Sequence, residues 1–252
     1  MTVFNPASRR PLESSTSALL ARAPRTAVRP GDYEAAPFMW ADGGPPGGGR
    51  IDGTAESVGI AMTVALRPMQ IREEIMITIP RGWEGGVGSR LLAYRLGEIV
   101  PGQGQVVVPT GVVQLSRPGD AGHARAIVLT KYEDVFAGNG LTVLDTLSMP
   151  VNVYPARVEF GLSTQVAWVY ARPALASRGQ HLIVAATGSQ GLVPGDQFSL
   201  RVNRKGEVTG DVEVAVAQVT RVTFWGVSAI VLDVSDAGVN PGTRAQVSAK
   251  MP

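Results

Sequence analysis

Two histidines, His123 and His181, are the first candidates for acid–base chemistry, because no other histidine occurs in the chain. Histidine is the side chain whose ordinary pKa lies closest to neutrality, so it is the usual proton carrier of a Ser-His-acid triad. His123 follows Gly-Asp-Ala-Gly in a predicted loop, and His181 opens a predicted strand. Their spacing indicates no triad. We therefore expect surface or edge-strand histidines and a chain that is not an enzyme.

Metal and nucleotide sites are equally poorly supported. The sequence has no cysteine, no HxH or HExxH motif and no carboxylate-rich calcium loop, so we expect no metal and no cofactor. DVSDAG, from Asp233 to Gly238, is typical of a hairpin turn. GGPPGGGR lacks the Lys-Ser/Thr of a phosphate loop and favours a linker, with an anion contact through Arg50 as the alternative.

Nucleic-acid binding by a small β-barrel needs exposed aromatic rings beside basic residues. Aromatic residues make up only 6% of the chain, and its lysines are Lys131, Lys205 and Lys250. Trp83 and Trp225 fall at predicted turns, where they could stack on a base or cap a core. A nucleic-acid partner is not expected.

The first 30 residues carry five arginines and one glutamate, a net charge of +4 in a chain of formal charge +2. A basic arm of this kind suits an acidic protein, a nucleic acid or an anionic lipid surface, although a solvated tail has the same composition. No apolar run approaches the ~18 residues of a membrane-spanning helix, and no continuous signal-peptide core is present. Either the chain is cytoplasmic, or Met1 is not the start of the translated product.

Residues 1–51 form an extended, Pro/Gly-rich N-terminal arm in our interpretation. It ends in DGGPPGGGRIDG, which we expect to sustain neither a helix nor a central strand, while SSTSALLARA could form one or two helical turns. Clustered apolar residues in a polar arm need a surface to bury against, either a partner or the body of the chain itself. The candidate partner-binding residues are Arg22, Arg25, Arg29, Phe38, Met39 and Trp40.

The tetrapeptide AIVL occurs twice, from Ala126 and again from Ala229, and its recurrence indicates an internal duplication. Three further matches keep the same order, with offsets that stay between 104 and 107 residues. They are Arg67-Pro68 with Arg172-Pro173, 74–95 with 181–202, and 135–143 with 239–247. We therefore expect a first β-module over 52–147, a hinge over 148–157 and a second β-module over 158–252.

Each module is predicted to be built from five or six short strands. The alternation from Gln197 to Val202 is typical of a half-buried antiparallel strand, and AIVL predicts a strand buried on both faces. VPGD at 193–196 and NPGT at 240–243 predict type II turns. The fold class is all-β: two tandem small barrels or sandwiches related by duplication and preceded by the arm.

Several segments together resemble a group of bacterial envelope proteins that carry a LysM peptidoglycan-binding module. APRTAVRPGDYEAAPF is similar to the linker of that group, and GQVVVPTGVVQL resembles its first β-module. GLVPGDQFSLRV, DVEVAVAQVTRVTFWGVSAIVLD and GTRAQVSAKMP resemble the remainder. Residues 1–50 show no LysM pattern, so no glycan-binding residue can be transferred, and peptidoglycan is a partner only if a LysM module lies upstream.

The resemblance implies a non-enzymatic structural or anchoring protein of the cell envelope or periplasm, peripheral to the membrane. In this hypothesis the arm binds a protein partner and the β-modules act as rigid spacers. The alternative is an accessory scaffold subunit of a large membrane complex, such as an energy-transducing or secretion machine. A hydrolase or ligand-binding barrel would require a pocket with convergent polar groups.

Overall fold

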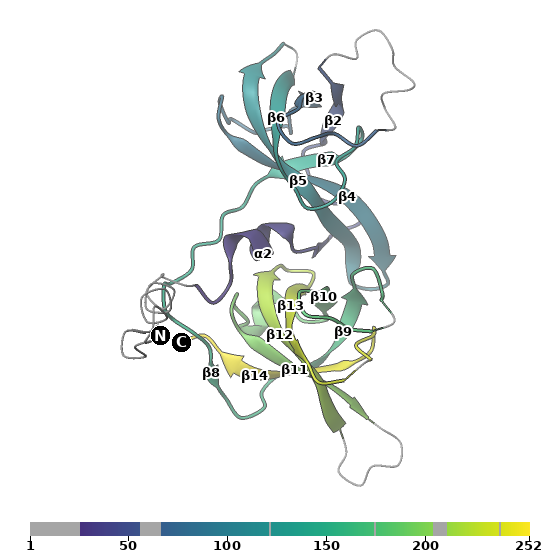
Figure 1. Ribbon diagram of the computed structural model, residues 1–252, viewed down its shortest axis with the longest axis vertical. Coiled ribbons are helices and arrows are strands. Elements are labelled where there is room, and N and C mark those ends of the chain that lie inside the picture. Colours follow the sequence, from purple (N-terminus) through teal and green to yellow (C-terminus); the bar gives the residue numbers. More distant parts are fainter. Residues whose placement is uncertain (1–25, 56–66, 121, 174, 204–210, 237) are drawn as a thin grey trace, which may run out of the picture.

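The computed structural model describes residues 26–55, 67–120, 122–173, 175–203, 211–236 and 238–252. It contains two β-barrels stacked along the long axis of the molecule, with a short helix between them (Figure 1). The all-β prediction of two tandem modules is confirmed.

The first barrel is a ring of six antiparallel strands in the order β5-β4-β7-β2-β3-β6, closed by pairing of β6 with β5. Strand β1 extends the sheet beside β5. The strands are β1 (Phe38–Trp40), β2 (Gly49–Thr54), β3 (Glu74–Thr78), β4 (Arg90–Val100), β5 (Gly104–Pro118), β6 (His123–Lys131) and β7 (Gly140–Val143).

The second barrel is a ring in the order β11-β12-β13-β10-β9-β14, closed by pairing of β14 with β11, and the short strand β8 extends it beside β14. Its strands are β8 (Ala156–Arg157), β9 (Ser163–Val169), β10 (His181–Val184), β11 (Gln197–Asn203), β12 (Asp211–Val222), β13 (Val227–Val234) and β14 (Arg244–Lys250). The helical elements described are α2 (Pro30–Ala35) and the 3₁₀ turn η2 (Gly188–Gln190).

The two rings have the same topology. Replacing β2 to β7 by β9 to β14 in chain order converts the first ring into the second, strand for strand. Their registers also agree: Ile75 pairs with Ala126 in the first barrel, and Leu182 pairs with Ala229 in the second. The offsets found in the sequence therefore correspond to equivalent positions in space, as duplication requires.

The irregularities of the ladders are duplicated as well. The β4–β5 register shifts after Ala93, and the β11–β12 register shifts after the equivalent Leu200. The pairing of β2 with β3 and that of β9 with β10 share a further shift, after Ile51 and Val166 respectively. Bulges strengthen the local twist of a sheet, so shared bulges give the two barrels the same curvature.

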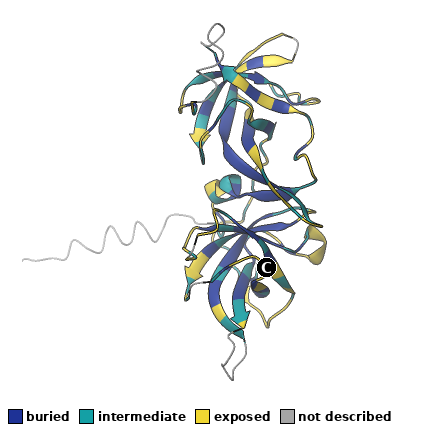
Figure 2. Cartoon of the chain, turned by 90° about the vertical axis from the view of Figure 1, so that its right-hand side faces the viewer, coloured by how far each residue is buried: buried dark blue, intermediate teal, exposed yellow. Residues whose placement is uncertain are grey.

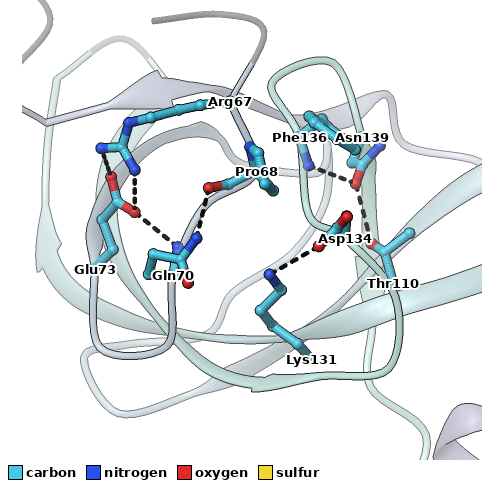
Figure 3. A network of polar contacts seen from close by, with 9 residues as sticks. All are labelled: Arg67, Pro68, Gln70, Glu73, Thr110, Lys131, Asp134, Phe136 and Asn139. Carbon is cyan, nitrogen blue, oxygen red and sulfur yellow. Dashed lines mark hydrogen bonds and ion pairs between the residues drawn. The ribbon is translucent and has the colours of Figure 1, made fainter.

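The turn before the last strand of each barrel is held by a side chain at an equivalent position. In the first barrel the Asn139 Oδ1 accepts hydrogen bonds from the Phe136 amide and the Thr110 hydroxyl (Figure 3). In the second barrel the Thr243 hydroxyl oxygen accepts from the Asn240 amide. Figure 3 also shows Arg67 paired with Glu73 at this end of the first barrel.

Two local predictions were wrong. Gly49–Thr54, which we expected to form no central strand, is β2 and lies between β7 and β3. Its side chains alternate between the inside and the outside of the barrel: Ile51 is fully buried and Asp52 is exposed. This alternation favours a strand more than the glycines of the segment disfavour one. Strand β2 begins before the expected start of the first module at residue 52.

The AIVL segments are not buried on both faces. Within both AIVL segments burial alternates from one residue to the next, and Leu232 is 38% exposed. Each strand of a small barrel turns only one face inward, and a strand is buried on both faces only where another part of the fold covers the outer face, as it does along β5. The predicted turns at VPGD and NPGT place Gly195 and Gly242 at positive φ, as type II geometry requires.

Candidate binding groove at the junction of the barrels

A segment that belongs to neither ring joins the two barrels. We call residues 28–40 the strap; it comprises α2 and β1 (Figure 1). Strand β1 pairs with β5 of the first barrel, Met39 opposite Val106. From the second barrel, the Ser228 hydroxyl donates to the Pro37 carbonyl at 2.6 Å and the Thr223 hydroxyl donates to the Met39 carbonyl at 3.2 Å. One short strand thus bonds to both barrels.

Met39 occupies the centre of this joint and is fully buried. It packs in a cluster with Val106 and Val108 of β5 on one side and with Trp168 and Ile183 of the second barrel on the other. Figure 2 shows that burial continues through the waist between the barrels. Burying a methionine side chain contributes about 2 kcal/mol, so the cluster holds the two barrels together as one unit.

A buried cation locks the strap to the second barrel. The guanidinium of Arg221, at the end of β12, lies over the rings of Tyr33 and Phe38 at 4.3 and 4.5 Å from their centres. Burial lowers the pKa of Arg221, while the nearby Tyr33, Asp145 and Glu34 act in the opposite direction. Contact with two aromatic faces compensates for part of its lost hydration.

Two tyrosines complete this network. The Tyr33 hydroxyl donates to Asp145 at 2.5 Å, and the Tyr132 hydroxyl donates to Glu34 at 2.6 Å. Burial raises the pKa of Tyr33 to about 12, and burial with the Glu34 hydrogen bond raises the pKa of Tyr132. Both phenols are therefore neutral donors at physiological pH.

Polar contacts on the opposite margin also cross the junction. The Tyr170 hydroxyl of the second barrel donates to Glu133 of the first, which also accepts two hydrogen bonds from Arg95. Arg172 contacts Glu98 with both carboxylate oxygens within 2.7 Å of one guanidinium nitrogen. The exposed Arg172–Glu98 pair adds orientation more than stability.

A groove of about 870 Å³ opens between the barrels beside the strap. Aromatic and proline side chains are prominent in its walls, and charged, aliphatic and glycine residues lie among them. The aromatic and proline residues are Tyr33, Phe38, Trp40, Trp83, Phe224, Trp225, Pro45, Pro46 and Pro80; the charged residues are Arg81, Glu84, Asp145 and Arg221. The volume lies within the range of ligand sites in proteins.

The turn between β12 and β13 supplies the exposed end of this groove. Phe224 is 74% exposed and Trp225 37% exposed, and their rings pack edge to face with centres 5.2 Å apart. Trp225 also lines an adjoining hollow of about 540 Å³ with Ile99 and Val100. The apolar surface therefore continues past Trp225 along the β4–β5 hairpin.

The candidate residues proposed from the sequence are distributed differently. Arg22 and Arg25 lie outside the described residues, as does the predicted helical segment SSTSALLARA. Arg29 is exposed and lines a second groove on the flank of the second barrel, with Asp32 and Arg178. Among the apolar candidates, Phe38 and Met39 are buried against the body of the chain, whereas Trp40 is half-buried and lines the junction groove.

The remaining sequence candidates contact residues of their own barrel. His123 lies 3.3 Å from Asp52, and Arg50 pairs with the same carboxylate. Asp233, at the end of β13, pairs with Arg178. In the described segments no three His, Asp or Glu side chains gather in a group able to hold a metal ion.

Sequence reasoning placed Trp83 and Trp225 at turns but did not bring them to one groove, and it missed Arg221. The one available signal was a difference between the copies. Arg221 aligns with Arg117, and the following residues are Val-Thr-Phe-Trp-Gly in one copy and Pro-Gly-Asp-Ala-Gly-His in the other. A departure from the duplicated pattern marks the turn that faces the groove.

No protein-family model matches the chain, and no curated protein matches it.

Proposed function

We propose that this protein is a non-enzymatic scaffold of a bacterial envelope assembly, in which two fused barrels form a rigid spacer that binds a protein partner at the junction groove. The observation that carries the proposal is the position of β1. Strand β1 pairs with β5 of the first barrel. The carbonyl of Met39 in β1 and that of the preceding Pro37 accept hydrogen bonds from hydroxyl groups of the second barrel. A joint of this kind fixes the distance and angle between two modules, which is what a spacer requires.

The groove supports the partner-binding part of the proposal. Monomeric proteins seldom expose a contiguous set of large apolar side chains without a use for it, and aromatic residues dominate binding hot spots. Phe224, Trp225 and the neighbouring Ile99, which is 58% exposed, form such a set at a concave surface. The envelope assignment depends on the resemblance of the β-modules to LysM-containing proteins.

Membrane association of the assembly would be peripheral under this proposal. Among the helices in the described parts of the chain, none is long and apolar enough to cross a bilayer.

Site-specific photo-crosslinking in the native cells tests the proposal. A photoreactive phenylalanine analogue at position 224 should form a discrete adduct with one protein, identified by mass spectrometry. The same analogue at Leu175, which is 67% exposed and lies away from the groove, is the matched control. Equal, diffuse labelling from both positions would reject partner binding at the groove.

Fractionation separates the envelope proposal from an accessory subunit of a large membrane complex. After enzymatic digestion of peptidoglycan, a cell-wall scaffold should be released, whereas a subunit of a membrane complex should stay with the membranes. Recovery in the cytosolic fraction before digestion would contradict both assignments.

A ligand-binding barrel is a second candidate function, and a specific observation favours it. The groove contains convergent polar groups, with the Tyr33–Asp145 hydrogen bond and Arg221 at one wall. Screening the purified protein against a small-molecule library by thermal shift tests this candidate, with Phe224→Ser as the groove control. A ligand whose stabilising effect persists in that variant would not be bound there.

A further inference from the structure

We infer that the junction groove binds a proline-rich segment of the partner in the polyproline II conformation. This inference depends on the proposed partner-binding function and names the chemistry that the groove recognises. It follows from the composition of the walls, from their hydrogen-bonding groups, from their charge and from the continuation of the surface past Trp225.

The walls have the composition of a polyproline-binding surface. Trp40, Trp83 and Trp225 contribute indole rings from three separate parts of the chain, and Phe224 adds a fourth ring. Surfaces that recognise proline-rich segments are lined by aromatic rings, because the flat faces pack against pyrrolidine rings. The ligand is already extended when free, so it loses little conformational entropy on binding.

The hydrogen-bonding groups are complementary to such a ligand. Indole and guanidinium groups are donors only, and Arg81 adds an exposed guanidinium to the wall. A proline residue presents a carbonyl acceptor and no N–H donor, so a proline-rich segment offers acceptors to these indole and guanidinium donors.

The charges of the walls balance, since Arg81 and Arg221 are matched by Glu84 and Asp145. A strongly basic or acidic ligand would meet as many repulsive as attractive groups. An apolar, uncharged peptide avoids that cost, because its carbonyl oxygens need only neutral or cationic donors.

The lined surface continues beyond the groove itself. The hollow lined by Ile99 and Val100 adjoins the groove at Trp225, so one ring borders both. A polyproline II segment advances about 3.1 Å per residue, so a peptide of roughly ten residues is about 30 Å long, and we expect it to extend from the groove into this hollow.

The internal duplication shows that the aromatic turn is particular to this site. In the first barrel the turn equivalent to Thr223–Gly226 has no aromatic residue, although the flanking strands pair in the same register. The shared barrel fold therefore does not require Phe224 and Trp225. Their presence only at the groove supports a binding role.

Peptide display on the purified full-length protein tests the inference. A library of random twelve-residue peptides should yield binders enriched in proline, and labelled decaproline should bind with saturation in a fluorescence anisotropy titration. A Gly-Ser decapeptide with the same label is the peptide control. Enrichment of sequences without proline, or no enrichment at all, would overturn the inference.

The variants locate the binding. Phe224→Ser, and the double variant with Trp225→Ser, should weaken decaproline binding by at least about tenfold, because a few aromatic residues supply most of the affinity in typical interfaces. Leu175→Ser should leave the affinity unchanged, and Phe224 is exposed enough to be replaced without unfolding the protein. Unchanged affinity in both groove variants would place the binding elsewhere and refute the inference.

The two proposals fail in different ways. If peptides do not bind but the partner identified by crosslinking no longer co-purifies with Phe224→Ser, the scaffold function stands and the polyproline inference falls. If the partner remains bound in that variant while decaproline binding is lost, the groove binds proline-rich peptides and the proposed function of the groove is wrong.

Discussion

The guanidinium of Arg221 lies 4.3 Å from the centre of the Tyr33 ring, in the interior of the joint between the barrels. Its Nε and Nη2 atoms are buried and make no hydrogen bond to the described residues. The aromatic faces of the strap are therefore the principal partners of this cation. Arg117, at the equivalent position of the first barrel, is exposed, so the same residue type has a structural role in only one copy.

Replacement of Arg221 by lysine should destabilise the protein by about 2 kcal/mol, because an ammonium group cannot stack between two rings and is more strongly hydrated than a guanidinium. Arg117→Lys should change the free energy of unfolding by less than about 0.5 kcal/mol, as is usual for surface substitutions. Urea denaturation followed by tryptophan fluorescence measures both values. Similar losses in the two variants would contradict the structural role of Arg221.

Gly104→Ala should displace β1 from the first barrel. A Cβ at this position would lie 2.2 Å from the carbonyl oxygen of Trp40, and the backbone φ of +110° adds strain. Gly102 has a φ of +75° with no atom near its Cβ position, so Gly102→Ala is a matched control with conformational strain alone. We expect a loss of about 1 kcal/mol for the control and clearly more for Gly104→Ala.

Amide hydrogen exchange provides the structural readout for this pair. In Gly104→Ala the amides of β1 and of the facing part of β5 should lose protection, whereas Gly102→Ala should keep them protected. Intact protection of β1 in both variants would show that the close approach of Gly104 and Trp40 is not required.

His181 should make stability fall as the solution becomes acidic. Burial lowers the pKa of His181 below its ordinary value, with Asp32 opposing the shift, and its Nδ1 has no hydrogen-bond partner among the described residues. The unfolded chain then binds the proton more readily than the folded one, so stability is lost as pH falls below about 6.5. His181→Gln removes the titrating group and should flatten the dependence between pH 7.5 and 5.

The comparison is made by urea denaturation at both pH values, with His123→Gln as the control because His123 is exposed. The control should keep the pH dependence of the wild-type protein. If His181→Gln keeps it too, other groups are responsible for acid destabilisation.

The buried carboxylate of Asp196 should contribute strongly to the stability of the second barrel. Its side chain is fully buried, and its two oxygens accept hydrogen bonds from the Val193 amide at 3.1 Å and the Met251 amide at 2.8 Å. Asp196→Ala leaves both amides without this acceptor, which should cost about 2 to 4 kcal/mol. Asp196→Asn retains one acceptor oxygen and should lose less.

Asp120, the last residue of another Pro-Gly-Asp sequence, provides the control because its side chain is exposed. Asp120→Ala should leave the thermal midpoint within about 1 °C of wild type, since surface substitutions have small effects. Equal shifts for Asp196→Ala and Asp120→Ala would mean that the buried carboxylate contributes nothing special.

Much of the fold follows from local patterns in the sequence. The alternation from Gln197 to Val202 identifies β11, and the repeated offsets identify equivalent strands, because side-chain periodicity and duplication are both properties of neighbouring positions along the chain. Strand Gly49–Thr54 was missed because its glycines and the adjacent prolines disfavour a strand, and its alternation of buried and exposed side chains extends over only a few residues. The closure of each ring then limits burial of AIVL to one face, which no local pattern could show.

The sequence by itself determined that this protein is all-β, that its two halves are copies and that aromatic residues fall at turns such as Trp83 and Trp225. Only the tertiary structure decided that Phe38 and Met39 join the barrels from within, that Arg221 is buried between rings, and that the turn aromatics line one groove. The physical reason is that strand formation depends on local periodicity. The joint and the groove instead depend on contacts between residues far apart in the sequence, such as Met39 with Val106 and Ser228 with Pro37.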